Sequence, residues 1–244
     1  MVKPKKKMQN SEKLVVITGG TKGIGKALVL TFVSEGFSVA TCARNEDNLT
    51  ALKSRIKESY DILIHTYPAD LSQKEKVAGF IEFIHQIKKP IEILINNTGV
   101  FIPGEVLGEE EGALETMIST NLYSAYHLSR GVVPEMVRSK RGHIFNICSV
   151  ASLKAYPNGG SYSISKFAMY GFSQALREEL KGKGVRVTSV LAGAVLTPSW
   201  DGVDLPEERF MKPEDIAKTI FSTFQLSERT VIEEIILRPQ LGDI

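Results

Sequence analysis

A tyrosine and a lysine one helical turn apart, Tyr162 and Lys166, are the residues of this chain whose types and spacing best suit chemistry. Side chains four positions apart lie on the same face of a helix, so a phenol and an ammonium would be neighbours. A phenol has a pKa of about 10, and a nearby positive charge favours its ionised form. The pair is a candidate for proton transfer, although the same spacing also occurs on ordinary half-exposed helices.

A glycine-rich segment, residues 18–25, follows the unbroken apolar run 14–17 and precedes an amphipathic pattern. This order predicts a strand buried on both faces, a turn and a helix. Glycines let the backbone approach a ligand closely, and free N–H groups at a helix start attract a pyrophosphate. The spacing Gly-x-x-x-Gly-x-Gly differs from the Gly-x-Gly-x-x-Gly of many dinucleotide-binding folds, and an ordinary strand-to-helix turn is the alternative.

Strand-like and helical segments alternate along the rest of the chain. The sequence predicts a Rossmann-like α/β fold, a doubly wound parallel sheet of about seven strands with a short lid over the substrate. Ligands of such sheets bind beyond the carboxyl ends of the strands. Two long helices are expected at residues ~109–138 and ~161–180. The predicted strands are 14–17, 38–43, 62–66, 91–95, 143–147, 185–191 and 234–237.

These motifs together resemble the short-chain dehydrogenase/reductase family over residues 13 to 239. The family's glycine motif corresponds to residues 18–25, its Asp-Leu to Asp70-Leu71 and its Asn-Asn-Ala-Gly to residues 96–99. The sequence departs from the family at Thr98, where Ala is usual, and at Ala192, where Pro is usual. Neither change falls on a reacting group.

The family's catalytic residues fall on Asn121, Ser149, Tyr162 and Lys166. The resemblance implies hydride transfer between a nicotinamide and a carbonyl carbon. Ser149 would hold the carbonyl oxygen and Tyr162 would protonate it. Lys166 would bond the ribose hydroxyls and keep Tyr162 acidic, and Asn121 would fix a water molecule. Alternatively, Ser149 caps the strand end and Asn121 bonds backbone within a helix.

The charge pattern after the second strand favours NADP(H) as the cofactor. No acidic residue occurs there before Glu46, whereas Arg44 and Lys22 offer positive charge to a 2′-phosphate. Alternatively, Arg44 is solvated or stacks on the adenine. With the positions that the resemblance supplies, the predicted cofactor-binding residues are Gly19, Thr21, Lys22, Gly23, Ile24, Gly25, Arg44, Asp70, Leu71, Asn97, Gly99, Tyr162, Lys166, Gly193, Val195 and Thr197.

The expected substrate is a small carbonyl compound or alcohol. The resemblance is broadest to 3-oxoacyl-[acyl-carrier-protein] reductases and related general reductases. An acidic carrier could dock on Lys140, Arg141 and Lys183, although lysines at helix ends are commonly only solvated. The competing class is a non-catalytic NADP-binding sensor or scaffold. The residues expected to form an apolar substrate pocket are Val100, Phe101, Ile102 and Trp200.

Composition predicts one catalytic domain, residues 13–244, after a basic tail, residues 1–12. The tail is expected to be solvated and to bind no nucleic acid. No apolar run reaches the ~18 residues of a membrane span. Cys42 and Cys148 lie in apolar strand segments, which favours free thiols and a cytoplasmic location. No metal is expected, because the histidines lack ligand spacing: His65, His85, His127 and His143.

Self-association is expected from the two long helices, because a helix lying on a sheet needs only one apolar stripe. These two carry apolar residues on more than one face, and the apolar segment 235–241 adds a further contact. The pattern predicts a homodimer or a homotetramer. The residues concerned are Leu122, Tyr123, Tyr126, Leu128, Phe167, Met169, Tyr170 and Phe172.

Overall fold

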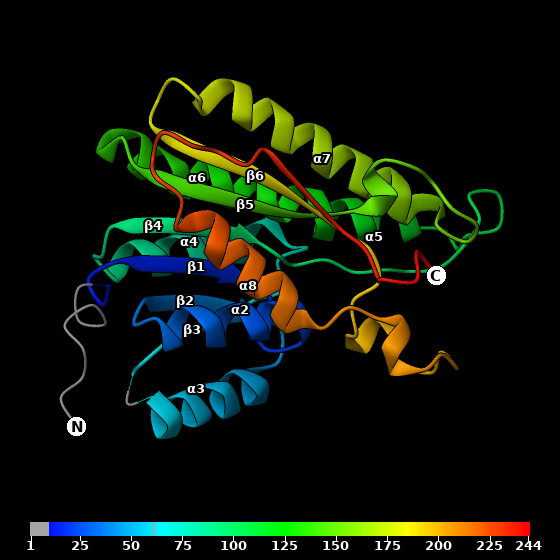
Figure 1. Ribbon diagram of the computed structural model, residues 1–244, viewed down its shortest axis with the longest axis horizontal. Coiled ribbons are helices and arrows are strands. Elements are labelled where there is room, and N and C mark those ends of the chain that lie inside the picture. Colours follow the sequence, from blue (N-terminus) through cyan, green and yellow to red (C-terminus); the bar gives the residue numbers. More distant parts are fainter. Residues whose placement is uncertain (1–9, 61) are drawn as a thin grey trace.

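The computed structural model describes residues 10–60 and 62–244, so the lysines of the tail at positions 3 to 7 lie outside the described residues (Figure 1). Seven parallel strands form one sheet in the order β3-β2-β1-β4-β5-β6-β7, which confirms the predicted fold class. The strands are β1 Leu14–Thr18, β2 Ser38–Ala43, β3 His65–Pro68, β4 Ile91–Asn96, β5 Gly142–Ser149, β6 Val185–Ala192 and β7 Glu234–Leu237.

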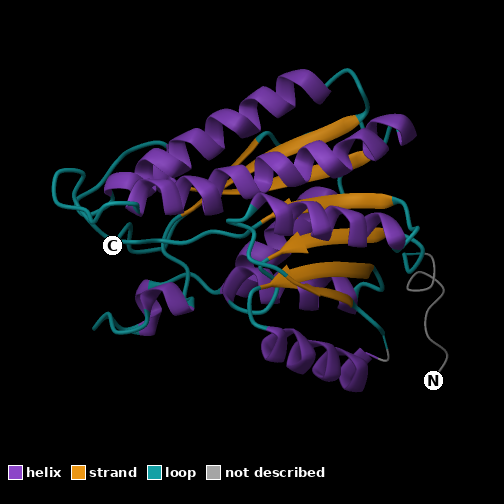
Figure 2. Ribbon diagram, turned by 180° about the vertical axis from the view of Figure 1, so that it is seen from behind, coloured by secondary structure: helices purple, strands orange, loops and turns teal. Residues whose placement is uncertain are grey.

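Helices lie over both faces of the sheet, as the two opposite views of Figures 1 and 2 show. They are α2 Gly23–Ser34, α3 Glu46–Tyr60, α4 Lys74–Gln86, α5 Ala113–Ile118, α6 Ser124–Ser139, α7 Gly160–Leu180 and α8 Pro213–Phe224. Side chains of α2, α3 and α8 pack on one face, and those of α4, α6 and α7 on the other. Both cores are apolar because strands covered on two faces must bury side chains in both directions.

The predicted third strand was wrong in its bounds. Residues 62–64 are not in a strand, and β3 pairs with β2 from His65 onward. The apolar run misled because Leu63 is 61% exposed, whereas the real strand is short, polar and at the sheet edge. Edge strands lack the buried surface that gives central strands their apolar pattern.

The first long helix also differs from its prediction. It begins at Ala113 rather than near 109, because Gly112 takes a left-handed conformation (φ 88°) at its start. A π-helical segment, Ser119–Tyr123, then joins α5 to α6. The second long helix, α7, agrees with its prediction to within one residue. Within the described residues, no helix combines the length and apolarity needed to cross a bilayer.

Candidate active site

The predicted site residues meet along the edge of the sheet that the carboxyl ends of the parallel strands form, because each residue follows one of these ends. The glycine turn follows β1, Asn97 follows β4, and Ser149 ends β5. Arg44 and Asp70 follow β2 and β3 in the same way, and Gly193 follows β6. Figure 1 shows this edge at the right, where the connecting loops gather.

The glycine turn is closed by contacts that leave no room for side chains. Gly19 has φ +70°, and a Cβ on Gly25 would lie 2.1 Å from the Gly19 carbonyl oxygen. The Asn97 amide donates to the Thr18 carbonyl at 2.8 Å, so the end of β4 holds the turn. Helix α2 begins at Gly23 with no side-chain cap, which leaves its first N–H groups available to a phosphate.

Two cations flank this turn. Lys22 and Arg44 are exposed, and neither side chain makes a hydrogen bond or ion pair with another described residue. Asp70 instead uses its carboxylate locally, accepting from the Ser72 backbone at 3.1 Å and hydroxyl at 2.8 Å. Leu71 is buried in the core, and Thr21 and Ile24 are partly buried in the turn and the first turn of α2.

Asn121 lies in the π-helical segment and is buried. Its amide donates to the Val100 carbonyl at 3.0 Å and to the Ser165 hydroxyl at 2.9 Å, and its oxygen accepts from the Val100 N–H at 2.7 Å. It therefore bonds backbone, as the alternative interpretation held, but the backbone of the loop after β4 rather than of its own helix. This ties that loop to α7.

Ser149 ends β5 and caps the backbone there, as the alternative interpretation held, while its expected contact with a substrate carbonyl stays a prediction. Its hydroxyl accepts from the Ala151 N–H at 3.1 Å, which caps the short helical turn that follows. It also lies near enough to the Tyr162 phenol to lower the pKa of that phenol. One residue that sequence reasoning missed supports this position: Ser152 accepts from the Ser149 N–H at 3.2 Å and donates to the Lys166 carbonyl at 2.8 Å. The Ser-x-x-Ser spacing after a strand was a usable signal.

The Tyr162 ring packs edge-on against Phe101, with centroids 4.9 Å apart. Burial raises the pKa of the Tyr162 phenol, and the nearby Ser149 hydroxyl opposes that shift. The net direction is upward because burial is the largest influence, and the expected effect of Lys166 on the phenol stays a prediction. A neutral phenol is nevertheless the form that can donate a proton.

Lys166 is buried on the same face of α7, with Nζ 5.7 Å from the Tyr162 ring centroid. Its ammonium donates to the Ile147 carbonyl at 3.0 Å, and burial lowers its pKa. A Cβ on Gly99 would lie 3.5 Å from Nζ and 3.3 Å from the Asn121 oxygen. Glycine at this position therefore leaves open the approach to both groups.

The loop after β6 closes the other side of the site. The Gly193 N–H donates to the Leu237 carbonyl at 2.8 Å, and Val195 is buried beside Met211. Thr197 lies against the glycine turn, since a Cβ on Gly23 would come within 2.8 Å of its methyl group. Trp200 packs on Phe210 at 5.1 Å between centroids, so it anchors the short lid.

A second missed residue, Glu109, holds the start of α7. Its carboxylate accepts from the Ser161 N–H at 2.8 Å and from the Ser161 hydroxyl. The bridge between Gly104 and Gly159 lies beside it. No local signal marked Glu109, because its partner lies 52 residues away in the sequence.

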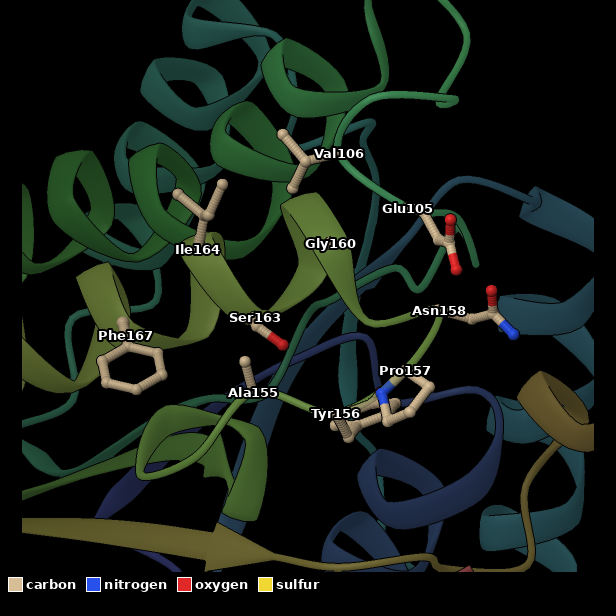
Figure 3. Close-up of a pocket in the computed structure, with 10 residues that line it drawn as sticks. All are labelled: Glu105, Val106, Ala155, Tyr156, Pro157, Asn158, Gly160, Ser163, Ile164 and Phe167. Atoms are coloured by element: carbon tan, nitrogen blue, oxygen red, sulfur yellow. The ribbon is translucent and has the colours of Figure 1, made fainter.

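A pocket of about 520 Å³ lies beside the first turns of α7, and Figure 3 draws the side chains that line it. Its walls are mainly apolar and include Val106, Ile164 and Phe167. Tyr156 also lines the pocket, and burial, together with the nearby Tyr162, raises the pKa of the Tyr156 phenol to about 12. The buried Ser163 hydroxyl lines the pocket without a hydrogen-bond partner among the described residues.

The basic residues considered for a carrier protein lie elsewhere. Lys140 and Arg141 precede β5, and Lys183 precedes β6, so all three are at the opposite edge of the sheet from Ser149. The four histidines are scattered, and no group of three or more potential metal ligands exists among the described residues. His143 is buried, bonds Thr188 at 2.8 Å and stacks on Phe145. Cys42 and Cys148 are buried free thiols, as predicted.

The fold and this edge define a Rossmann-like oxidoreductase site. A family model described as short chain dehydrogenase matches residues 13–207, and the chain belongs to that family, as its motifs predicted. The chain is similar to sepiapterin reductase of Chlorobaculum tepidum, with 34% identity over 245 residues that cover 95% of this chain and 98% of the relative.

Solved structures agree with this family assignment. A metagenomic short-chain oxidoreductase in complex with NADP has a TM-score of 0.83 and 29% identity, covering 96% of this chain and 99% of that one. Serine dehydrogenase from Escherichia coli has a TM-score of 0.82 and 27% identity, covering 95% and 100% of the two chains. Their names span different substrates, so the family fixes the reaction type rather than the substrate.

Proposed function

We propose that this enzyme transfers hydride between NADP(H) and a carbonyl compound or secondary alcohol, using Asn121, Ser149, Tyr162 and Lys166. The observation that carries the proposal is the partly exposed Tyr162, which lies near Ser149 and 5.7 Å from the buried Lys166 ammonium, measured to the ring centroid. These groups stand where the carboxyl ends of β4 and β5 meet, the edge at which such sheets bind ligands.

Each of the four residues has a separate role in the proposed reaction. NADPH, when bound, supplies the hydride that the carbonyl carbon accepts. Ser149 orients the carbonyl oxygen, and Tyr162 transfers its proton to that oxygen as the carbon–hydrogen bond forms. Lys166 has N–H groups beyond the one given to Ile147, and Gly99 leaves them open to the ribose hydroxyls. Asn121 keeps the loop after β4 and helix α7 in register, and a water at its backbone would connect Lys166 to solvent.

The cofactor is NADP(H) rather than NAD(H). The glycine turn is a cradle that a Cβ on Gly25 would fill, and the uncapped α2 suits a pyrophosphate. Lys22 and Arg44 are free to bind a 2′-phosphate, and a relative with 29% identity carries NADP. Gly193, Val195 and Thr197 would flank the nicotinamide half.

The substrate is a small carbonyl compound with an apolar face, because Phe101 packs against Tyr162 and Trp200 anchors the lid. A 3-oxoacyl carrier protein is the second candidate on family resemblance. The basic residues once considered for carrier docking do not support it, since they lie at the far edge of the sheet.

The test is a panel of ketones, aldehydes and acyl thioesters, each assayed with NADPH and with NADH. We expect NADPH oxidation with at least one ketone or aldehyde, and its loss in Tyr162→Phe. If NADPH binds tightly but no member of the panel is reduced, the non-catalytic sensor is favoured. If NADH is used equally well, the proposed role of Lys22 and Arg44 is wrong.

The enzyme also works as a homodimer or homotetramer in the cytoplasm, in our proposal. Leu128 and Met169 are buried within the chain, so they no longer argue for a partner. Tyr123, Tyr126 and Phe167 remain exposed on α6, its preceding π segment and α7, an apolar surface that a second copy would cover. Light scattering would contradict this if the mass equals the 26.9 kDa of one chain.

A further inference from the structure

A cavity lies at the edge that the amino ends of the parallel strands form, opposite the candidate active site, and its lining residues take no part in the proposed reaction. It has a volume of about 570 Å³ and lies where β5 and β6 begin, between the ends of α6 and α7 and the loop from α8 to β7. This edge is at the left in Figure 1. β5 spans Gly142–Ser149, so at ~3.3 Å per residue the cavity is roughly 23 Å from Ser149.

The lining of this cavity is strongly basic. Seven of its residues are Lys or Arg and only two, Glu92 and Glu228, are acidic. The chain as a whole has a formal net charge of only +2, so this excess is local. A concave surface of one charge sign concentrates the electrostatic potential and attracts ions of the opposite sign.

The acidic residues do not neutralise the cavity. Glu92 is 6% exposed and pairs with Arg141 at 2.7 Å and with Lys13 at 3.6 Å, so its charge is already compensated. Arg141 also lies 3.7 Å from Glu228, whose side chain is 76% exposed and weakly held. Two further cations of the lining pair with carboxylates outside it, Arg177 with Glu233 at 2.8 Å and Lys181 with Glu178 at 2.5 Å. Three positive charges therefore remain in excess.

One wall of the cavity is rigid. Arg186 donates to the carbonyls of Phe224, Leu226 and Thr230, and its guanidinium lies 5.9 Å from the Phe224 ring centroid. The loop from α8 to β7 is thus wrapped around a partly buried cation. A prepared wall reduces the ordering cost of binding a ligand.

Two cations at the mouth have no partner. Lys140, in a left-handed conformation after α6, and Arg229 are exposed, and neither side chain pairs with any described residue. Arg and Lys side chains with free N–H donors are common ligands of phosphate groups. The volume falls within the 300–1,000 Å³ typical of small-molecule sites.

We propose that this cavity binds a phosphate-bearing small anion of nucleotide size, at a site separate from the cofactor. The phosphates contact Lys140 and Arg229. The shared chemistry is the phosphate, and inorganic pyrophosphate and ADP distinguish a phosphate-only site from one that also reads a nucleoside.

The test is calorimetric titration of the full chain with pyrophosphate and with ADP at low salt, after saturation with NADPH. The variant is Lys140→Gln with Arg229→Gln, and the matched control is Lys57→Gln with Lys218→Gln, two exposed lysines outside the cavity. We expect the cavity variant to weaken binding about 10- to 100-fold. The control variant and NADPH affinity should stay within about twofold of wild type.

The outcomes separate clearly. Binding of both probes at similar affinity supports a phosphate-only site, and tighter ADP binding supports a contribution from the nucleoside. Absence of binding by either probe, or equal losses in the two variants, overturns the proposal. The substituted side chains are exposed, and the measurement is the binding of pyrophosphate or ADP. The result therefore does not depend on whether a carbonyl substrate is found.

Discussion

The half of the site proposed to carry out catalysis and the half proposed to bind the 2′-phosphate differ in how their polar side chains are held. Asn121, Ser149 and Lys166 are buried and already hydrogen-bonded within the protein. Lys22 and Arg44 are exposed and bond no other described residue. Groups that must act on a reacting atom are fixed before the substrate arrives, whereas groups that recognise a flexible phosphate adjust to it.

The largest effect is expected at the fixed half. Tyr162→Phe keeps the ring against Phe101 but removes the proton donor, so kcat should fall about 10²- to 10⁴-fold. NADPH affinity, measured by fluorescence titration, should change little. Unchanged turnover in a folded variant would remove Tyr162 from the mechanism.

Substitution of Lys22 or Arg44 should change the affinity for the cofactor rather than the turnover rate. Arg44→Gln or Lys22→Gln removes a charge-assisted contact, so the Kd for NADPH should rise about 10- to 100-fold. NADH, which lacks the 2′-phosphate, is the internal control, and Arg55→Gln on the exposed surface of α3 is the matched variant. Parallel losses for NADPH and NADH would reject the assignment.

The glycine turn connects the two halves, and its tightness can be tested separately. Gly25→Ala would place a Cβ 2.1 Å from the Gly19 carbonyl oxygen, so the turn must shift, at a cost of about 1–3 kcal/mol. Gly182→Ala, which meets no atom within 4 Å, should change stability by less than ~0.5 kcal/mol. Denaturant unfolding measures both, and equal values would show that the turn tolerates a side chain.

The smallest effect is expected at the support of α7. Glu109→Gln replaces a charged acceptor of two Ser161 donors by a neutral one, which should cost about 1 kcal/mol of stability. A few-fold fall in kcat with unchanged NADPH affinity would indicate that the carboxylate positions Tyr162. Glu110→Gln, an exposed neighbour, is the control, and an identical response in both variants would contradict this role.

The sequence predicted what depends on local pattern. β1 and β4 are buried along their whole length, so their apolar runs identified them. Motif spacing and the family resemblance supplied the candidate site residues, whose roles stay predictions. Prediction from the sequence failed where distant residues decide the structure. β3 is defined by its pairing with β2, Asn121 by Val100 and Glu109 by Ser161, and none of these partners is near in sequence. The direction of the Tyr162 pKa shift likewise depends on burial, which spacing does not encode.

The π-helical segment Ser119–Tyr123 changes the direction in which the side chains of α5 point relative to those of α6. A π turn holds about one more residue than an α turn, and each residue turns a helix by about 100°. Ahead of the segment α5 packs against α7, and beyond it α6 packs against α4 and the sheet. Deleting a single residue here would restore a regular helix but swing one half about its axis, carrying Met117 out of its buried position. The extra residue thus lets one continuous helix pack against neighbours that lie on different sides of it.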